Sequence, residues 1–179
     1  MQATMFFILL GVVGLAALVD RQIGAATIPP LGPERTSGPL HFRLPSTWAI
    51  ISDPNPQPGV IAEATQGRLT LKVFRQRLRR LMSPEDYLER SDMLSDIFAG
   101  DTPPDEVDHV TMGGAPALRV RGQVQYETPL AKWIESETVQ CAVFPNRQAV
   151  TLWLSDRGEE TDADAILLDY VAATVRVDQ

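Results

Sequence analysis

The sequence predicts an α+β domain in which two helices pack on a central antiparallel sheet. Apolar and polar residues alternate along several short segments, as in strands that have one buried face. Glycine, proline or asparagine separates most of these segments by a few residues, and such short connections join antiparallel neighbours. Two other segments repeat apolar residues at helical spacing behind helix-start signals. Hydrophobic residues make up 44% of the chain, which is enough to form a core.

The strand expected at the centre of the sheet lies in the segment Met112–Tyr126. The Gly113-Gly114 pair near its start predicts a turn, because glycine reaches positive φ without a Cβ clash. Beyond the turn, Arg119 and Arg121 alternate with apolar residues, so we expect their stems to pack and their guanidinium groups to reach water. The apolar residues expected on the buried face are Leu118, Val120, Val124 and Tyr126.

The beginning of the chain predicts export or membrane anchoring. Met5–Val19 is an unbroken apolar run that is shorter than the roughly 20 residues of a spanning helix. This length suits a signal peptide or a short anchor, and Gly24–Ala26 offers small residues for cleavage. Cleavage, retention and a buried core helix are the alternatives for the run. We divide the chain into an N-terminal hydrophobic signal or anchor segment (1–22), a proline-rich tether (23–39) and a domain (40–179).

Short strands are expected in the first half of the domain, followed by a helix. The strand pattern covers residues 42–44, 48–51, 60–64 and 68–74, with a turn at Gln66-Gly67. Ser83 is a good helix N-cap, Pro84 suits the first helical position, and Gly100 would end the helix. The apolar residues expected on this helix are Tyr87, Leu88, Leu94, Ile97 and Phe98.

The second half of the domain predicts a hairpin and a closing helix. Residues 132–144 and 148–154 alternate around Pro145-Asn146, which is typical of a turn between two strands. A helix is expected to start at Thr161. Its apolar face would consist of Ala163, Ile166, Leu167, Tyr170, Val171 and Thr174.

The order of these landmarks resembles the PsbP-like family. The matching features are the opening Phe42–Trp48, the capped helix with Tyr87-Leu88, the strand after Gly113–Ala117, and Trp133 on a later strand before the hairpin and last helix. The resemblance covers about 40–177. It implies a central antiparallel sheet flanked by helices on both faces, an α/β/α sandwich. It also implies a binding or accessory module without catalysis, and the first 39 residues resemble the bacterial envelope members best.

The sequence offers no convincing catalytic, cofactor-binding or metal-binding constellation. It has two histidines, whereas a histidine-based metal site needs several ligands that converge. His41 and His109 are interpreted as surface imidazoles, although His109 with Asp105 or Asp108 would imitate part of a hydrolase triad. The single cysteine, Cys141, lies on the apolar phase of a strand and is expected to be buried. A net charge of −7 argues against general nucleic-acid binding.

A run of basic residues is the sharpest local feature. It places five of the chain's 16 positive charges within nine residues. The members of this basic run are Lys72, Arg75, Arg77, Arg79 and Arg80. The plain interpretation is a solvated strand end and loop. The functional interpretation is an electropositive surface that docks an acidic partner or anionic lipid head groups.

We therefore expect a non-enzymatic module of the cell envelope, with its domain outside the cytoplasm, that docks a protein partner. The N-terminal segment would contact the membrane, and no cofactor or nucleic acid is expected. Two alternatives stay open. One is a hydrolase that uses His109, and the other is a small-molecule carrier with a pocket between sheet and helix.

Overall fold

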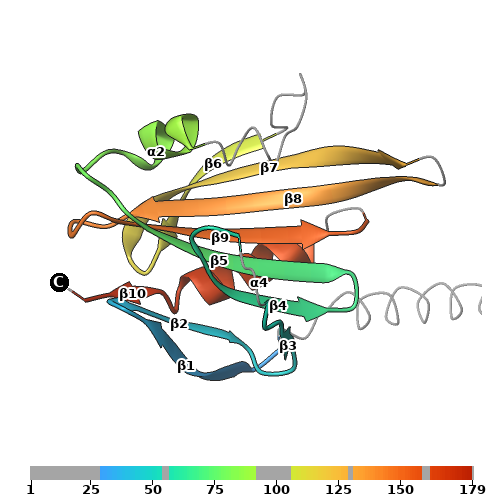
Figure 1. Cartoon of the computed structure of the whole chain (residues 1–179), viewed down its shortest axis with the longest axis horizontal. Helices are drawn as coiled ribbons and strands as arrows, with labels where there is room; N and C mark the ends of the chain where they lie inside the picture. The colour runs from blue at the N-terminus through green and yellow to red at the C-terminus, as the bar shows by residue number, and fades with distance from the viewer. Residues whose placement is uncertain (1–28, 54–56, 92–105, 129–130, 159–161, 179) are drawn as a thin grey trace, which may run out of the picture.

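The computed structural model describes residues 29–53, 57–91, 106–128, 131–158 and 162–178 (Figure 1). Side chains are described throughout these ranges except at 125–128, 131 and 162–164. The predicted N-terminal segment lies outside them. No helix within the described ranges is both long and apolar enough to cross a membrane. The fold is α+β and mostly antiparallel sheet, as the sequence predicts.

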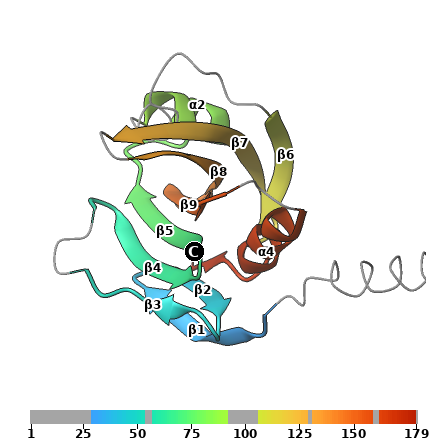
Figure 2. The same ribbon diagram turned by 90° about the vertical axis from the view of Figure 1, so that its right-hand side faces the viewer.

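Seven strands form the main sheet in the order β3-β4-β5-β9-β8-β7-β6, and every pair is antiparallel. The strands are β3 (Ala49–Ile50), β4 (Val60–Gln66), β5 (Leu69–Arg77), β6 (Glu106–Met112), β7 (Ala115–Thr128), β8 (Ala131–Val143) and β9 (Gln148–Asp156). Gly67 and Gly113-Gly114 have positive φ at the predicted turns. The sheet curls strongly from β3 at one edge to β6 at the other (Figure 2).

A second sheet has the order β1-β2-β10. Its strands are β1 (Leu31–Ser37), β2 (Leu40–Pro45) and β10 (Arg176–Val177). β1 lies inside the stretch 23–39 that we expected to be a tether, so the folded part begins earlier than predicted. Proline is tolerated in β1 because the strand is at the edge of its sheet and its register shifts between Leu31 and Glu34.

The two described helices are α2 (Pro84–Arg90) and α4 (Asp162–Ala172). The Ser83 side chain accepts a hydrogen bond from the Asp86 backbone N–H at 3.1 Å, which confirms the predicted cap of α2. The C-cap of α2 is Ser91, and the rest of the predicted helix up to Gly100 lies outside the described residues. α2 lies against β7 and β8, whereas α4 lies against β2, β6 and β9 (Figure 2).

Neighbouring residues of β7 pack into different hydrophobic clusters. Leu118 and Val120 belong to the cluster that contains Tyr87 and Leu88 of α2. Ala117 belongs to the larger cluster that contains Leu167, Leu168 and Val171 of α4, together with residues of β2, β5 and β9. This sorting confirms the predicted buried phase for Leu118, Val120 and Val124, while the Tyr126 side chain lies outside the described set.

The expectation that Arg119 reaches water is wrong. Arg119 is only 6% exposed, and its Nη2 donates to the Asp169 carboxylate on α4. Arg121, which is partly exposed, pairs with Glu106 at 2.6 Å and Asp108 at 2.8 Å on the neighbouring strand β6. The polar phase of β7 is therefore occupied by ion pairs rather than by water, because α4 and β6 supply carboxylates there.

The buried face of α4 differs from the predicted one. Leu167 and Val171 are buried as expected, but Ile166 is 49% exposed and Tyr170 is 39% exposed. Leu168 and Ala172 are buried in their place, and Val175 is buried beyond the end of the helix. The residues 168, 171 and 172 also follow helical spacing, so the sequence allows two faces, and contact with β2 and β9 selects the second one.

Within the second sheet, a small polar cluster connects β1, β2 and the residue after β10. His41 on β2 lies 3.0 Å from Asp178 through Nε2 and 3.4 Å from Glu34 through Nδ1. The hydrogen bond to Asp178 raises the pKa of His41, and the hydrogen bond from Arg176 lowers the pKa of Glu34. His41 is therefore more than the surface imidazole that the sequence predicts, because it links β2 to Glu34 of β1 and to Asp178 just beyond β10.

Val120→Asp tests the strand phase. Val120 is 2% exposed, so the variant would bury an unpaired carboxylate, which costs several kcal/mol out of a typical stability of about 5–15 kcal/mol. Val107 is the matched control because it sits directly opposite on β6 and is 52% exposed. We expect Val107→Asp to cost less than about 1 kcal/mol. Urea midpoints measure both, and equal losses would mean that the phase is wrong.

The His41 cluster predicts a pH-dependent contribution to stability. Because the folded pKa of His41 is raised, its contribution is fully present below the ordinary value of 6.5 and is lost as pH rises through the folded pKa. Asp178→Asn removes the carboxylate that contributes most to the raised pKa of His41. We expect the NMR titration of His41 to move to lower pH in this variant, and the loss of stability above pH 6.5 to become smaller. An unchanged His41 titration would contradict the pairing.

Candidate functional site

The structure separates the members of the predicted basic run. Alternate residues of β5 point in opposite directions, so Lys72 and Arg75 cannot share one surface. The Lys72 ammonium lies 5.5 Å from the centroid of the Trp153 ring and 3.3 Å from the Gln57 side-chain oxygen. Arg75 donates through Nη1 to the Ser37 carbonyl at 2.6 Å and thereby links β5 to β1. Both cations therefore already contact other parts of the domain.

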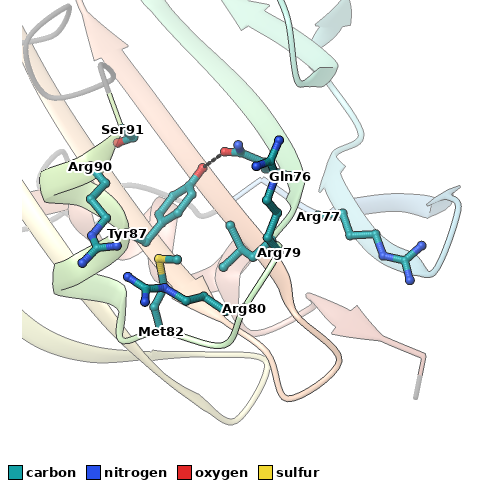
Figure 3. Close-up of a pocket in the computed structure, with 9 residues that line it drawn as sticks. Gln76, Arg77, Arg79, Arg80, Met82, Tyr87, Arg90 and Ser91 are labelled. Carbon is teal, nitrogen blue, oxygen red and sulfur yellow. Dashed lines mark hydrogen bonds between the residues drawn. The ribbon is translucent and has the colours of Figure 1, made fainter.

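The remaining members lie at the end of β5 and in the loop that leads to α2. Arg77 is exposed and points away from Tyr87 and Met82, whereas Arg79 and Arg80 lie on the side of these residues (Figure 3). The structure adds Arg90, which the sequence interpretation missed. Arg90 follows Tyr87 by three positions on α2, and this spacing puts the two side chains on one side of the helix. The three-residue spacing between Tyr87 and Arg90 is the sequence signal that could have identified Arg90 as a member of the site.

These side chains surround a hollow of about 560 Å³ between the end of β5 and α2 (Figure 3). We call it the arginine pocket. Its lining residues are Gln76, Arg77, Leu78, Arg79, Arg80, Met82, Tyr87, Arg90 and Ser91. Its volume falls within the range of about 300–1,000 Å³ that is usual for ligand sites. Its apolar base and its ring of guanidinium groups suit a ligand that has both apolar and anionic parts.

Local packing explains why the arginines are held at the surface. Leu78 is 8% exposed, and its backbone N–H donates to the Arg147 carbonyl at 2.8 Å. The Arg147 side chain in turn donates to the Arg79 carbonyl at 3.3 Å. Tyr87 and Leu88 fix the opposite wall by packing in the cluster under α2. The loop is therefore tied to the β8–β9 turn, while its charged side chains stay in solvent.

The arginines of the pocket have no acidic partner within the described part of the chain. Arg79, Arg80 and Arg90 are exposed, and none forms an ion pair with a described carboxylate. Other arginines of the domain, such as Arg119 and Arg176, are paired. Guanidinium groups remain charged at any physiological pH and present planar sets of donors to carboxylates or phosphates. The pocket is therefore a positive site on a chain of net charge −7.

Tyr87 and Gln76 bridge the pocket. The Tyr87 hydroxyl donates to the Gln76 side-chain oxygen at 3.0 Å, a contact that joins α2 to β5 (Figure 3). Burial raises the pKa of Tyr87 to about 12, so its hydroxyl stays neutral. A neutral phenol leaves the positive charge of the neighbouring arginines uncompensated. The pair offers hydrogen-bonding groups at the centre of the site rather than a second charge.

A wider hollow of about 1020 Å³ lies near the C-terminus, between the β6–β7 turn, the β8–β9 turn and β10. Its charged residues are Arg176 and Asp178, and both are already paired, with Glu34 and His41 respectively. The backbone carbonyl of Asp178 also accepts a hydrogen bond from Asn146. This hollow is therefore held together by its own contacts, and the arginine pocket is the better candidate for recognising a charged ligand.

Among the described residues, the hydrolase candidates His109 and Asp108 do not converge. His109 is 82% exposed, and its Nδ1 lies 3.7 Å from Glu85. Asp108, the adjacent residue on β6, points the other way and pairs with Arg121. Asp105 lies outside the described residues. The groups in this region therefore form surface ion pairs, and none of the described contacts joins His109 to a serine or cysteine.

Cys141 is buried as predicted, with no exposed surface, and burial raises its pKa to about 12. A thiol in this state is a small apolar group and a poor nucleophile. Among the residues with described positions, no group of three or more histidine, cysteine, aspartate or glutamate side chains is arranged to hold a metal ion.

Known proteins resemble this chain in structure but not in sequence. No protein-family model and no curated protein matches the sequence. A protein from Bacteroides thetaiotaomicron has a TM-score of 0.55 and 10% identity, with 83% of this chain and 49% of that chain covered. The present chain thus corresponds to about half the length of that protein.

LpqN of Mycobacterium tuberculosis, described as involved in cell envelope biogenesis, has a TM-score of 0.57 and 14% identity. The comparison covers 78% of this chain and 83% of LpqN. At such identities, the two similarities show a shared fold. They do not include a PsbP-like protein, so that assignment remains a prediction.

Proposed function

We propose that this protein is a non-enzymatic binding module of the cell envelope that docks an acidic segment of a protein partner in the arginine pocket. The observation that carries the proposal is the set of three exposed guanidinium groups, those of Arg79, Arg80 and Arg90, around a partly apolar hollow. A carboxylate-bearing segment would supply the charges that the described part of the chain does not, and its apolar side chains would contact Met82 and Tyr87.

We also propose a location in the cell envelope and a PsbP-like fold for this protein. The envelope role described for LpqN, together with the apolar run Met5–Val19, supports a location at the membrane. We further propose that α2 and α4 cover opposite faces of the main sheet in a PsbP-like α/β/α sandwich. The division of neighbouring β7 residues between two hydrophobic clusters supports this arrangement.

Two rival functions make different demands on the chain. A hydrolase would need His109, so His109→Ala would abolish turnover of generic esters or phosphoesters. A small-molecule carrier would use the arginine pocket for an anionic metabolite, and free anions would then compete with any partner. The outward position of His109 disfavours the first rival. The open side of the arginine pocket, with its exposed arginines, favours a surface segment over an enclosed small molecule.

Site-specific photo-crosslinking tests the proposal in intact cells. Leu81 is 59% exposed in the loop between Arg80 and Met82, so a benzophenone side chain at this position of the full chain would report on the pocket. We expect a crosslinked protein that disappears in the Arg79→Glu/Arg80→Glu variant, because reversed charges repel an acidic segment. Mass spectrometry should place the crosslink in an acidic stretch of the partner.

The matched control is Arg43→Glu/Arg157→Glu, which makes the same change in charge at two exposed positions outside the pocket. It should leave the crosslink intact, and both double variants should keep the wild-type melting temperature to within a few degrees. A crosslink that survives charge reversal in the pocket, or that is lost equally in the control, would contradict docking at the arginine pocket.

A further inference from the structure

The arginine pocket continues into a second hollow along β5. This hollow, of about 230 Å³, is lined by Pro58, Gly59, Phe74, Arg75, Gln76 and Tyr87. Gln76 and Tyr87 line both hollows, so the two meet at the hydrogen-bonded bridge between β5 and α2. We call the combined depression the docking groove. It runs from Arg80 and Arg90 at one end to Pro58 and Phe74 at the other.

The two ends of the docking groove differ in chemistry. Phe74 is 6% exposed and stacks on Trp153 with the ring centroids 5.8 Å apart, which makes a rigid aromatic wall. Pro58 and Gly59 present an exposed, uncharged edge beside it. Arg75 adds no charge here, because its guanidinium group donates to the Ser37 carbonyl on the other side of β5. One end therefore carries several arginines, whereas the other is mostly aromatic and apolar, with the single cation Lys72 lying 5.5 Å from the centroid of the Trp153 ring.

The centre of the docking groove offers a hydrogen-bond donor to a peptide backbone. The Gln76 side-chain oxygen accepts from Tyr87, while no described residue accepts from its Nε2 group. That amide nitrogen is available to donate to a main-chain carbonyl. The Tyr87 oxygen already has a partner in the Thr151 side chain. A lipid chain would leave the Gln76 amide nitrogen without a partner at the point where the two hollows meet.

Resting on the proposed function, we infer that the docking groove binds an extended peptide segment of the partner, with acidic residues at one end and an apolar side chain at the other. Phe74 and Arg79 are five positions apart and β5 ends between them at Arg77, so an extended peptide of five residues, which covers roughly 17 Å, is long enough to reach from one to the other. The acidic residues would meet Arg79, Arg80 and Arg90. An aromatic or large aliphatic side chain about five residues away would pack against Phe74 and Pro58.

Fluorescence anisotropy with labelled peptides and the full chain in detergent micelles tests this inference. The probe is a peptide with three glutamates at one end and phenylalanine at the other, separated by two Gly-Ser pairs and synthesised in both chain directions. The comparison peptide replaces phenylalanine with glycine. We expect at least one direction of the probe to bind about tenfold or more tightly than its comparison peptide, because the aromatic end adds apolar burial.

Two charge variants then separate the ends of the docking groove. Pro58→Glu places a charge beside Phe74 at an exposed position and should remove the tenfold preference for the phenylalanine probe without changing the affinity for the comparison peptide. Arg80→Glu should weaken both peptides severalfold. Arg43→Glu, an exposed reversal outside the groove, should change neither affinity by more than about twofold.

The outcomes distinguish docking of an acidic segment from binding of a peptide that also has an apolar end. If Arg80→Glu weakens binding but the phenylalanine end gives no preference in either direction, the bipartite inference is overturned while docking of an acidic segment stands. If Arg80→Glu has no effect on either peptide, both claims fall. If phosphatidylglycerol vesicles bind in an Arg80-dependent way and neither peptide binds, the groove serves a membrane surface and the peptide inference is also overturned.

Discussion

The antiparallel pairing of β7, β8 and β9 is the constraint on which the rest of the structure depends. In this register Val120 faces Val139, which faces Trp153, so one set of cross-strand residues packs under α2. The alternate residues Ala117, Ala142 and Val150 pack in the cluster that includes α4. A shift of one residue would exchange the two sets and would place Arg119 in the α2 cluster. The register is therefore fixed by burial of both phases.

Polar contacts at the margins of the sheet complete this arrangement. Arg119 is buried on the phase opposite to Val120 and pairs with Asp169 of α4. Removal of Asp169 would leave the Arg119 charge without its counterion in a poorly solvated position. His41 has a comparable role at the second sheet, where it links β2 to Glu34 of β1 and to Asp178 beyond β10. These ion pairs specify which elements meet, and the hydrophobic clusters supply most of the stabilisation.

The candidate site follows from the same framework. β5 pairs with β9 over its full length, and the β5–α2 loop is tied to the β8–β9 turn through Leu78 and Arg147. α2 is anchored by Tyr87 and Leu88, so packing and hydrogen bonds hold both walls of the arginine pocket. A site built in this way holds its charge in place before a ligand arrives, which lowers the ordering cost of binding.

Much of the fold could be predicted from the sequence, because alternation and turn residues are local signals. The Gly113-Gly114 turn, the β8–β9 hairpin and the Ser83 cap depend on a few adjacent residues. The features that could not be predicted depend on tertiary contacts. β1 and its flanks contain four prolines and two glycines, which suggested a tether, yet pairing with β2 orders the strand. The exposed Ile166 and Tyr170, and the buried Arg119, result from where α4 packs.

The site could be predicted only in part for the same reason. Charge density identified the basic run, but β5 ends at Arg77, so Arg79 and Arg80 lie in the loop beyond the strand. Arg75 turns instead to the Ser37 carbonyl, and Arg90 joins the loop arginines from a separate helix. The basic run of the sequence is therefore divided in the structure, and the arginine pocket combines part of it with a residue from α2. The sequence could not show this because the path of the chain after β5 depends on the contact between Leu78 and Arg147.

The central claim is that the arginine pocket is the surface that receives acidic ligands. NMR titration of the arginine side-chain Nε–H signals with hexaglutamate tests it most directly, because each guanidinium group reports for itself. The account predicts that the signals of Arg79, Arg80 and Arg90 shift together and return when salt is added. Shifts of equal size at Arg43 and Arg157, or no shift at the pocket arginines, would contradict it.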